Sequence, residues 1–283
     1  MRFAIAFLFL AVSTFAQSGM SGSHAVTSTL TVPQTSGIPS TFLAPGPIHP
    51  YLPLATVNIT LPNTSGYTTQ TYTSFADLQS KINTAATLCD TGGTTGYVLS
   101  ATSGSAFSSS SATGLVLPAS SCVADYIIIT TAGFSGTRGV RIDPSTAAGS
   151  IAQLSDTAAN GAVLTCAANV PCNNYWFLGM ELQCIPSGFS CIGVQIPSAS
   201  TDTPAHLPNK IIFDHVYVHG RATNDTIHAF FFGGNNIAIV DSWVSDAHNV
   251  GQEAQAISGF AGGPRLYQNN FLEHGMPPAF GTG

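Results

Sequence analysis

The chain has 283 residues, of which 44% are hydrophobic and only 7% are charged, and its formal net charge is −6. This length allows one large domain, or one domain with a tail, and a composition low in charge suits many short strands joined by turns better than helices. The only lysines are Lys81 and Lys210 and no basic run exists. The chain therefore lacks the cationic surface that nucleic-acid-binding proteins need, and we expect no nucleic-acid partner.

The N-terminus, "MRFAIAFLFLAVSTFAQS", has the pattern of a secretory signal peptide. Arg2 precedes an apolar stretch of about ten residues, which is too short to span a bilayer, and Thr14 and Ala16 are small enough for the cleavage positions. We predict a signal peptide over residues 1–16 and a secreted or extracellular protein, with the periplasm or the cell surface as alternatives. No later segment reaches about 18 apolar residues, so we expect no membrane contact after cleavage.

Residues 17–70 are rich in Ser, Thr, Pro and Gly and show no hydrophobic periodicity, which predicts a flexible or extended leader. The segment after it contains the one good helix signal of the chain. Ser74 and Asp77 form a capping box, and Phe75, Leu78 and Ile82 then share one helical face. The spacing predicts a helix over residues 74–86 at the start of a domain that spans residues 71–283.

Six cysteines agree with export, because an even number in a secreted chain favours disulfides. They are Cys89, Cys122, Cys166, Cys172, Cys184 and Cys191. Fifteen pairings can be drawn for six cysteines. The nearest-neighbour set, 89–122, 166–172 and 184–191, would close a local loop with each bond. A metal site is disfavoured, since no CxxC pair is present.

A repeat appears from residue 173. Four segments begin with turn residues, run through an apolar strand, reach a polar kink and resume with a second apolar strand: "NNYWFLGMELQ", "NKIIFDHVYVHG", "NNIAIVDSWVSD" and "GPRLYQNNFLEHG". The kinks at Asp214, Asp241 and Asn269 recur every 27 or 28 residues, and a further short strand follows most units. A unit of three short strands without a helix predicts one coil of an all-β parallel solenoid, whose coils must stack to bury their apolar face.

Stacking places equivalent residues in columns about 4.8 Å apart. Aligning the kinks predicts an inward column of Met180, Val216, Trp243 and Phe271. It also predicts a polar corner column of Asp214, Asp241 and Asn269, whose members we expect to satisfy backbone groups rather than to act in catalysis.

The outward position after the second strand gives a column of His219, Asp246 and His274, which could hold a cation or supply a general base. The other charged candidates near this column are Arg221, His248, Glu253 and Arg265. Asp246 and Glu253 would be cation ligands or proton donors, and a histidine or an arginine would be the base. Three solvated turn residues that share a register by accident are the alternative. Alternation along residues 230–232 leaves either Phe231 or its two neighbours exposed, and an exposed ring could stack on a sugar.

The stretches "FADLQSKINTA", "RIDPS", "KIIFDHVYVHG", "AIVDSWVSDAHNVGQEAQAISGF" and "YQNNFLEHG" together resemble the secreted right-handed parallel β-helix proteins of the pectate-lyase-like superfamily. The resemblance covers roughly residues 72–280. It implies a right-handed parallel β-helix capped by the predicted helix, with an extracellular polysaccharide along its outer groove. Polygalacturonase signatures are absent in their usual arrangement. The lyase type that uses Asn and Glu as Ca²⁺ ligands is suggested by Asn269, Asn270 and Glu273.

We therefore predict a secreted polysaccharide-active protein with lyase-like cleavage of an acidic polysaccharide. Glycoside hydrolysis is less favoured, and a non-catalytic β-helix that binds glycan or presents a surface is the alternative. The cofactor that this chemistry suggests is Ca²⁺, which can bridge an acidic protein to an anionic polymer, with Asp246, Glu253 and Glu273 as its ligands. Related proteins usually continue into further coils beyond the point that corresponds to Gly283, so we also expect a last coil without a cap.

Overall fold

The computed structural model describes residues 57–91, 95–167, 170–185, 191–196, 206–221, 225–249, 253–259 and 262–274, all of which belong to the compact unit Leu54–Gly283. The predicted signal peptide and the leader up to residue 56 lie outside the described residues. The described part of the chain consists mainly of short strands, with two helices among them.

The strands form three sheets in which every pairing is parallel. Sheet A contains, in spatial order, β1 (Thr68–Thr71), β2 (Tyr97–Ala101), β5 (Ile127–Thr131), β8 (Asn173–Leu178), β11 (Asn209–Asp214), β14 (Asn235–Val240) and β17 (Arg265–Gln268). Sheet B contains β3 (Ala106–Ser109), β6 (Ala152–Asp156), β9 (Met180–Cys184), β12 (Tyr217–His219), β15 (Trp243–Ala247) and β18 (Phe271–His274). Sheet C contains β4 (Leu115–Leu117), β7 (Ala162–Cys166), β10 (Cys191–Ile196), β13 (Thr226–Phe232) and β16 (Gln255–Gly259).

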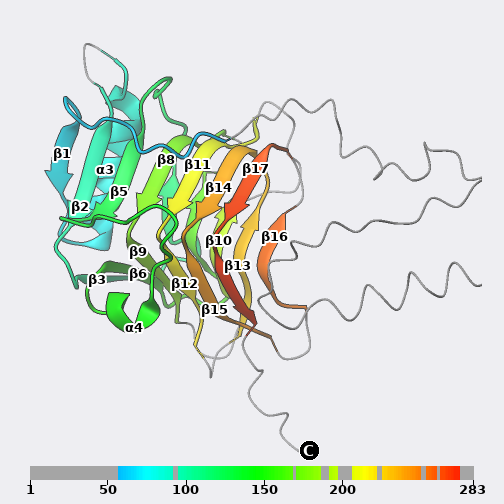
Figure 1. The fold of residues 1–283 in the computed structure, drawn as a ribbon. Coiled ribbons are helices and arrows are strands. Elements are labelled where there is room, and N and C mark those ends of the chain that lie inside the picture. The colour runs from blue at the N-terminus through cyan, green and yellow to red at the C-terminus, as the bar shows by residue number, and fades with distance from the viewer. Residues whose placement is uncertain are drawn as a thin grey trace, which may run out of the picture. The chain divides into compact units, whose positions relative to one another are not determined.

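From β2 to β16 each coil contributes one strand to sheet A, then one to sheet B, then one to sheet C, whereas β1 is followed by a helix and β17 by one described sheet B strand. Figure 1 shows the resulting row of sheet A arrows side by side, from β1 in blue to β17 in red. The predicted all-β parallel β-helix is confirmed, and the four repeated segments are the pairs β8–β9, β11–β12, β14–β15 and β17–β18.

The predicted helix is α3 (Phe75–Leu88), which begins after the N-cap Ser74. Ser74 Oγ accepts a hydrogen bond from the Asp77 amide, as predicted, and the Asp77 carboxylate accepts one from the amide of Thr73, the residue before the N-cap, so the two side chains together cap the helix. Leu78 and Ile82 are buried in the core, where α3 packs beside the first coils. The second helix is the single turn α4 (Pro144–Ala147), capped by Asp143.

The core fills the interior of the coils, where identical positions of successive strands stack on one another. One such column on sheet A contains Leu99, Ile129, Phe177, Phe213 and Ile239, and the rings of Phe177 and Phe213 stack with centroids 5.2 Å apart. All three disulfides of the nearest-neighbour set form, namely Cys89–Cys122, Cys166–Cys172 and Cys184–Cys191.

The outer face of sheet A is also apolar, which sequence analysis did not anticipate. Trp176, Ile212 and Ala238 lie there without solvent exposure, packed with Val57 and Ile59 of the segment before β1. Strand β1 itself pairs with β2. Residues 57–71, which composition assigned mainly to the leader, are therefore packed on the solenoid, and the folded part begins before residue 71.

The register at the corner between sheets A and B differs from the predicted one. The residues that take left-handed backbone conformations there are Gly179, His215, Asp241 and Asn269, with φ of 58°, 52°, 51° and 52°. We call these four residues the corner column. His215, rather than Asp214, is thus the equivalent of Asp241, because Asp214 still belongs to strand β11.

This shift of one residue changes the face of the following strand. Met180 and Val216 point inward and are fully buried, as predicted. Trp243 and Phe271 instead align with Glu181 and Tyr217 on the outer face of sheet B. The predicted inward column of four residues is therefore wrong in its second half.

Candidate functional site

A group of charged side chains gathers at the corner between sheets A and B. Arg138, from the connection after β5, places Nη2 2.7 Å from Asp214 Oδ2 and Nη1 2.9 Å from both Asp214 Oδ1 and Asp241 Oδ2. Both carboxylates are almost fully buried, whereas the Arg138 side chain is 38% exposed. The hydrogen bonds to Asp214 and Asp241 raise the pKa of the Arg138 guanidinium. The guanidinium in turn links two carboxylates from successive coils.

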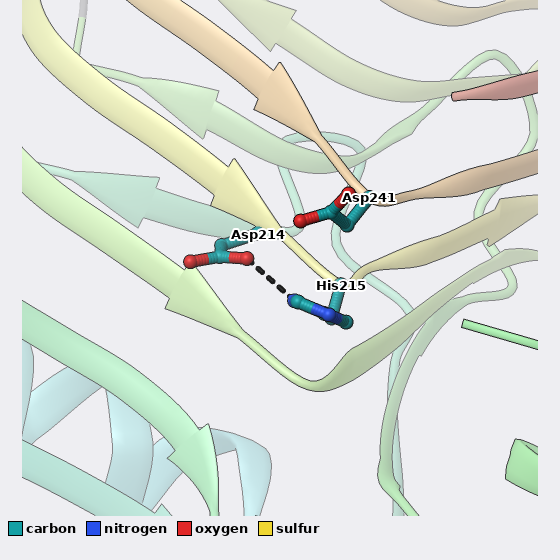
Figure 2. A group of neighbouring side chains, drawn as sticks. All are labelled: Asp214, His215 and Asp241. Carbon is teal, nitrogen blue, oxygen red and sulfur yellow. Dashed lines mark hydrogen bonds and ion pairs between the residues drawn. The ribbon is translucent and has the colours of Figure 1, made fainter. Parts of the chain in front are cut away.

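His215 completes the corner group, and Figure 2 shows its ring pointing toward Asp214 beside Asp241. Its Nδ1 lies 2.6 Å from Asp214 Oδ1, and its Nε2 lies 3.2 Å from the carbonyl oxygen of Thr137. Burial alone would lower the pKa of His215, but the bonds to Asp214 and Thr137 and the charge of Asp241 outweigh it and raise that pKa. Both ring nitrogens face acceptors, which is the arrangement that suits an imidazolium.

The remaining oxygen contacts of the corner group come from other donors. Trp176 Nε1 donates to Asp214 Oδ2, the Gly139 amide donates to Asp241 Oδ2, and Asn269 Nδ2 donates to Asp241 Oδ1. Burial by itself raises the pKa of Asp214, but its bonds to His215 and Arg138 outweigh burial and lower it. Our prediction that these acids serve only backbone groups is thus incomplete, because most of their partners are side chains.

The spacing of Asp214, His215 and Asp241 would also suit a metal ion, since one ligand atom of each lies within 4.8 Å of the others. The residues present do not fit one. The Arg138 guanidinium already supplies a positive charge to both carboxylates, and His215 Nδ1 faces a carboxylate oxygen instead of a vacant position. When His215 is protonated, its charge and that of Arg138 balance the charges of Asp214 and Asp241, so the group then has no net charge to offer a metal ion. We therefore assign the corner group to the scaffold.

The second cluster lies on the outer face of sheet B and is centred on an acid–imidazole pair. His219 Nε2 is 2.9 Å from Glu181 Oε1, and His219 Nδ1 is 2.9 Å from the carbonyl oxygen of Gly220. Because a carbonyl only accepts, Nδ1 carries a hydrogen, and Glu181 and His219 then hold one further proton between them. Gln153 Nε2 donates to the same Glu181 oxygen.

A column of aromatic rings begins beside this pair and continues along the outer face of sheet B. Tyr217 stacks on His219 with ring centroids 4.0 Å apart, and Trp243 stacks on Phe271 at 4.1 Å. The Tyr217 hydroxyl is 3.2 Å from Ser245 Oγ, which in turn lies 3.3 Å from Asp246 Oδ2. The pair and its neighbours thus form one hydrogen-bonded and stacked surface, which we call the sheet B face. It comprises Gln153, Glu181, Gln183, Tyr217, His219, Trp243, Ser245, Asp246, Phe271 and Glu273.

Three carboxylates converge on Tyr217. Burial raises the pKa of its hydroxyl above the ordinary value, and the charges of Asp246, Glu181 and Glu273 raise it further against the bond from Ser245. A phenol with a raised pKa remains a proton donor through neutral pH. The structure therefore brings together two predicted acids, Asp246 and Glu273, with one acid that sequence analysis did not select.

The predicted outward column of His219, Asp246 and His274 does not exist as such. His219 pairs in register with Gln183 and Ser245, and the backbone partner of His274 is Ala247. Asp246 takes a left-handed conformation, with φ of 55°, one position further along. The shift of one residue at the corner explains why His219 aligns with Ser245, and a separate irregularity in register between Val244 and Ala247 explains why His274 does not align with Asp246.

The other predicted residues are spread over several places. Arg221 is exposed just beyond β12, and His248 is fully buried, with no hydrogen-bond partner for either ring nitrogen in the described part of the chain. Glu253 is exposed before β16 on the sheet C side, where it accepts a bond from Gln255. Arg265 lies over the ring of Phe232, 5.8 Å from its centroid.

Phe231 is half-buried on the outer face of sheet C and stacks on His228, while Phe230 and Phe232 are buried in the core. This confirms the first of the two alternations considered for that run. Asp246, Glu253 and Glu273 do not form a three-ligand group, because within the described ranges the corner group is the only set of acids, cysteines and histidines that meets the spacing of a metal site.

Glu181, Tyr217 and Arg141 were not among the site residues predicted from the sequence. Glu181 and Tyr217 occupy the same column as Trp243 and Phe271, so alignment on the left-handed corner residues would have found them. Arg141 comes from the connection before α4, and its guanidinium carbon lies 5.8 Å from the centroid of the Phe271 ring. No local signal in the sequence places it there.

We compared the chain with known proteins, and no protein-family model, no curated protein and no solved structure matches it. No helix in the described ranges is long and apolar enough to cross a membrane. The three disulfides favour an oxidising compartment.

Proposed function

We propose that this chain is a secreted protein that acts on an acidic extracellular polysaccharide, and that the polymer lies along the sheet B face. The observation that carries the proposal is the Glu181–His219 pair beside a strip of stacked rings. The pectate-lyase-like resemblance of the sequence points to the same class of ligand, and the parallel β-helix agrees with it.

The aromatic strip supports sugar binding. Tyr217, Trp243 and Phe271 come from successive coils, are half-buried, and repeat at the spacing of about 4.8 Å between neighbouring strands. Rings that keep one part exposed offer an apolar surface to the C–H face of a sugar while their edges stay fixed by packing. An extended polymer running across the coils would meet one ring in each of three coils.

Two arginines could bind the acid groups of such a polymer. Arg141 is exposed, lies over Phe271, and has one long contact of 3.4 Å to the Asn270 carbonyl. Arg221 is exposed beyond the other end of β12. Guanidinium groups bind carboxylates with two parallel hydrogen bonds, so both arginines could bind uronate units.

The chemistry that fits is β-elimination. A base removes the proton beside the sugar carboxylate, the electron pair of that C–H bond forms a carbon–carbon double bond, and the neighbouring C–O bond breaks. The leaving oxygen then takes a proton. We assign proton removal to the Glu181–His219 pair and proton donation to the Tyr217 hydroxyl, which lies against His219. Asp246 and Glu273 are the acids available for the predicted Ca²⁺, which would neutralise the sugar carboxylate.

Non-catalytic glycan binding is the second candidate, and the burial of the pair favours it. Glu181 is 5% exposed and His219 is 8% exposed, and the hydrogen bonds of both side chains are made within the protein. A pair that serves only to order the surface would look the same. The aromatic strip and the arginines would then suffice for binding.

The test is an ultraviolet assay for unsaturated product on pectate, alginate and chondroitin, with Ca²⁺ and with a chelator, together with calorimetric binding on the same polymers. We expect product from at least one polymer, lost by at least a hundred-fold in Glu181→Gln and unchanged in the matched control Glu253→Gln. Loss in Glu253→Gln alone would return the site to the sequence-based hypothesis. Binding without product would favour the second candidate, and neither binding nor product would refute both.

A further inference from the structure

The connection between β5 and α4 crosses the corner of the solenoid as a strap, by which we mean residues 133–143. Its Ile142 amide donates to the carbonyl of Asp241, at 3.0 Å, and its Gly139 amide donates to the side chain of the same residue. Arg138 also reaches the carbonyl of Ile59, on the segment before β1. Together with the bonds from Arg138 to Asp214, these contacts fix the strap to three parts of the chain that are far apart in sequence.

Close contacts show how tightly the strap lies on the corner column. The ring of Phe134 covers Gly179, where an added Cβ would lie 2.2 Å from a ring carbon. At Gly136 an added Cβ would lie 2.6 Å from the ring of His215. Glycine at these two positions lets the strap contact the corner directly.

Two cavities, of about 530 Å³ and about 540 Å³, border this contact. Phe134, Gly136 and His215 line both of them. Water therefore has space next to the strap, and His215 lines both of these spaces. Water in these cavities can therefore solvate His215 when its protonation changes, and the core does not need to unfold.

The charges that face His215 make its proton important to the strap. Asp214 and Asp241 face it from strands β11 and β14, and Arg138 faces it from the strap, where Thr137 also offers its carbonyl. With the imidazolium present, two positive groups balance two carboxylates. Without it, a net negative charge stays in a buried site, and one of the two ring contacts loses its donor hydrogen.

We propose that protonated His215 latches the strap to the corner column, and that loss of this proton as the pH rises above neutral loosens residues 133–143. The sign follows from linkage. The pKa of His215 is raised in the folded protein, so the stabilisation is complete below its ordinary value of about 6.5 and is lost as the pH rises through the folded value.

The strap also connects to the sheet B face. Ile142, at its end, packs with Ala147 and Ile151 against the rings of Tyr217 and Trp243. A loosened strap would therefore expose more of both rings to a polymer. This consequence for polysaccharide binding depends on the function proposed above, whereas the latch itself does not.

Hydrogen–deuterium exchange of the full chain tests the latch. After correction for the intrinsic pH dependence of exchange, we expect peptides that cover residues 133–143 to exchange about ten-fold faster at pH 9 than at pH 6. His215→Asn should exchange at the faster rate at both pH values, because asparagine tolerates the left-handed backbone there, as Asn269 shows, but carries no titratable proton. His228→Gln, a histidine on sheet C, is the matched control and should keep the wild-type pH dependence.

Wild-type strap peptides whose corrected exchange does not change between pH 6 and pH 9 would overturn the latch, and this result needs no variant. A pH dependence that persists unchanged in His215→Asn would overturn it as well. Polysaccharide binding measured over the same pH range separates the two proposals. Faster strap exchange without binding at any pH would leave the latch standing and refute the proposed function.

Discussion

The corner group and the sheet B face both combine carboxylates with a histidine, but they use their hydrogen-bonding capacity differently. At the corner, Asp214 and Asp241 receive bonds from Arg138, and every titratable side chain there already has a partner of opposite charge. On the sheet B face, Trp243 and Asp246 are half-buried, and the neighbouring Arg141 is exposed with one long contact.

This difference shows why spacing alone is a poor guide to a functional site. The corner group has the spacing of a metal site and carries shifted pKa values, yet its charges cancel within the protein. Structural ion-pair networks shift pKa values just as active sites do. The sheet B face has unused donors and acceptors at the surface, and unused capacity is what a ligand requires.

Removal of Arg138 should give the largest effect on stability. Arg138→Met leaves two buried carboxylates without their shared cation, and we expect the free energy of unfolding to fall by about 3 kcal/mol, at the lower end of the usual range because the guanidinium is partly exposed. Urea denaturation at pH 7 measures it. The matched variant Arg221→Met, at an exposed position, should change stability by less than about 0.5 kcal/mol. Equal losses in the two variants would contradict the comparison.

Acid titration tests whether Asp214 of the corner group stabilises the protein through its charge. The pKa of Asp214 is lowered in the folded protein, so its stabilisation is present above the ordinary value of about 3.9 and is lost as the pH falls through the folded value. Asp214→Asn should cost about 2 kcal/mol at pH 7 and progressively less in acid. Urea midpoints measured from pH 7 to pH 2 would show this. A cost that is constant over the whole range would mean that Asp214 acts by shape alone.

Asp156 is also a buried carboxyl, but its pKa is raised, whereas that of Asp214 is lowered. It is fully buried, its Oδ2 has no hydrogen-bond partner among the described residues, and burial raises its pKa. Its contribution is therefore favourable at low pH and is lost as the pH rises through the folded value. We expect Asp156→Asn to stabilise the protein by about 1 kcal/mol at pH 7 and by little at pH 4, in the same denaturation series. Destabilisation at pH 7 would show that the carboxylate has a partner of its own.

The fold was predictable because its signals are periodic. Strand pairs whose corner residues recur after 26 and 28 residues, from His215 to Asp241 and from Asp241 to Asn269, specify a stacked coil without any long-range information. The capping box at Ser74 and Asp77 specifies the helix locally. The disulfides join near neighbours in sequence, so the simplest of the fifteen pairings was also the right one.

The site was only partly predictable, because it depends on register and on one distant segment. Aligning the repeats by residue type equated Asp214 with Asp241, whereas the backbone equates His215 with Asp241. That single residue decides whether Trp243 faces the core or the solvent. Arg138 lies 76 residues from Asp214, and no pattern in either segment indicates that they meet.

Asp246→Asn should have a very small effect on stability, and this variant tests whether Asp246 shapes a turn or binds a ligand. Asp246 has φ of 55° and one long bond from Ser245, so Asp246→Asn, which tolerates that backbone, should change the free energy of unfolding by less than about 0.5 kcal/mol. Asp246→Ala should cost about 1 kcal/mol, because alanine is disfavoured in the left-handed region. If Asp246 also binds Ca²⁺ on the sheet B face, calorimetry should show both variants losing Ca²⁺-dependent binding of polysaccharide by about ten-fold or more. Unchanged binding in the stable Asn variant would assign Asp246 to the turn and leave Glu181, His219 and Tyr217 as the residues on which the proposed function depends.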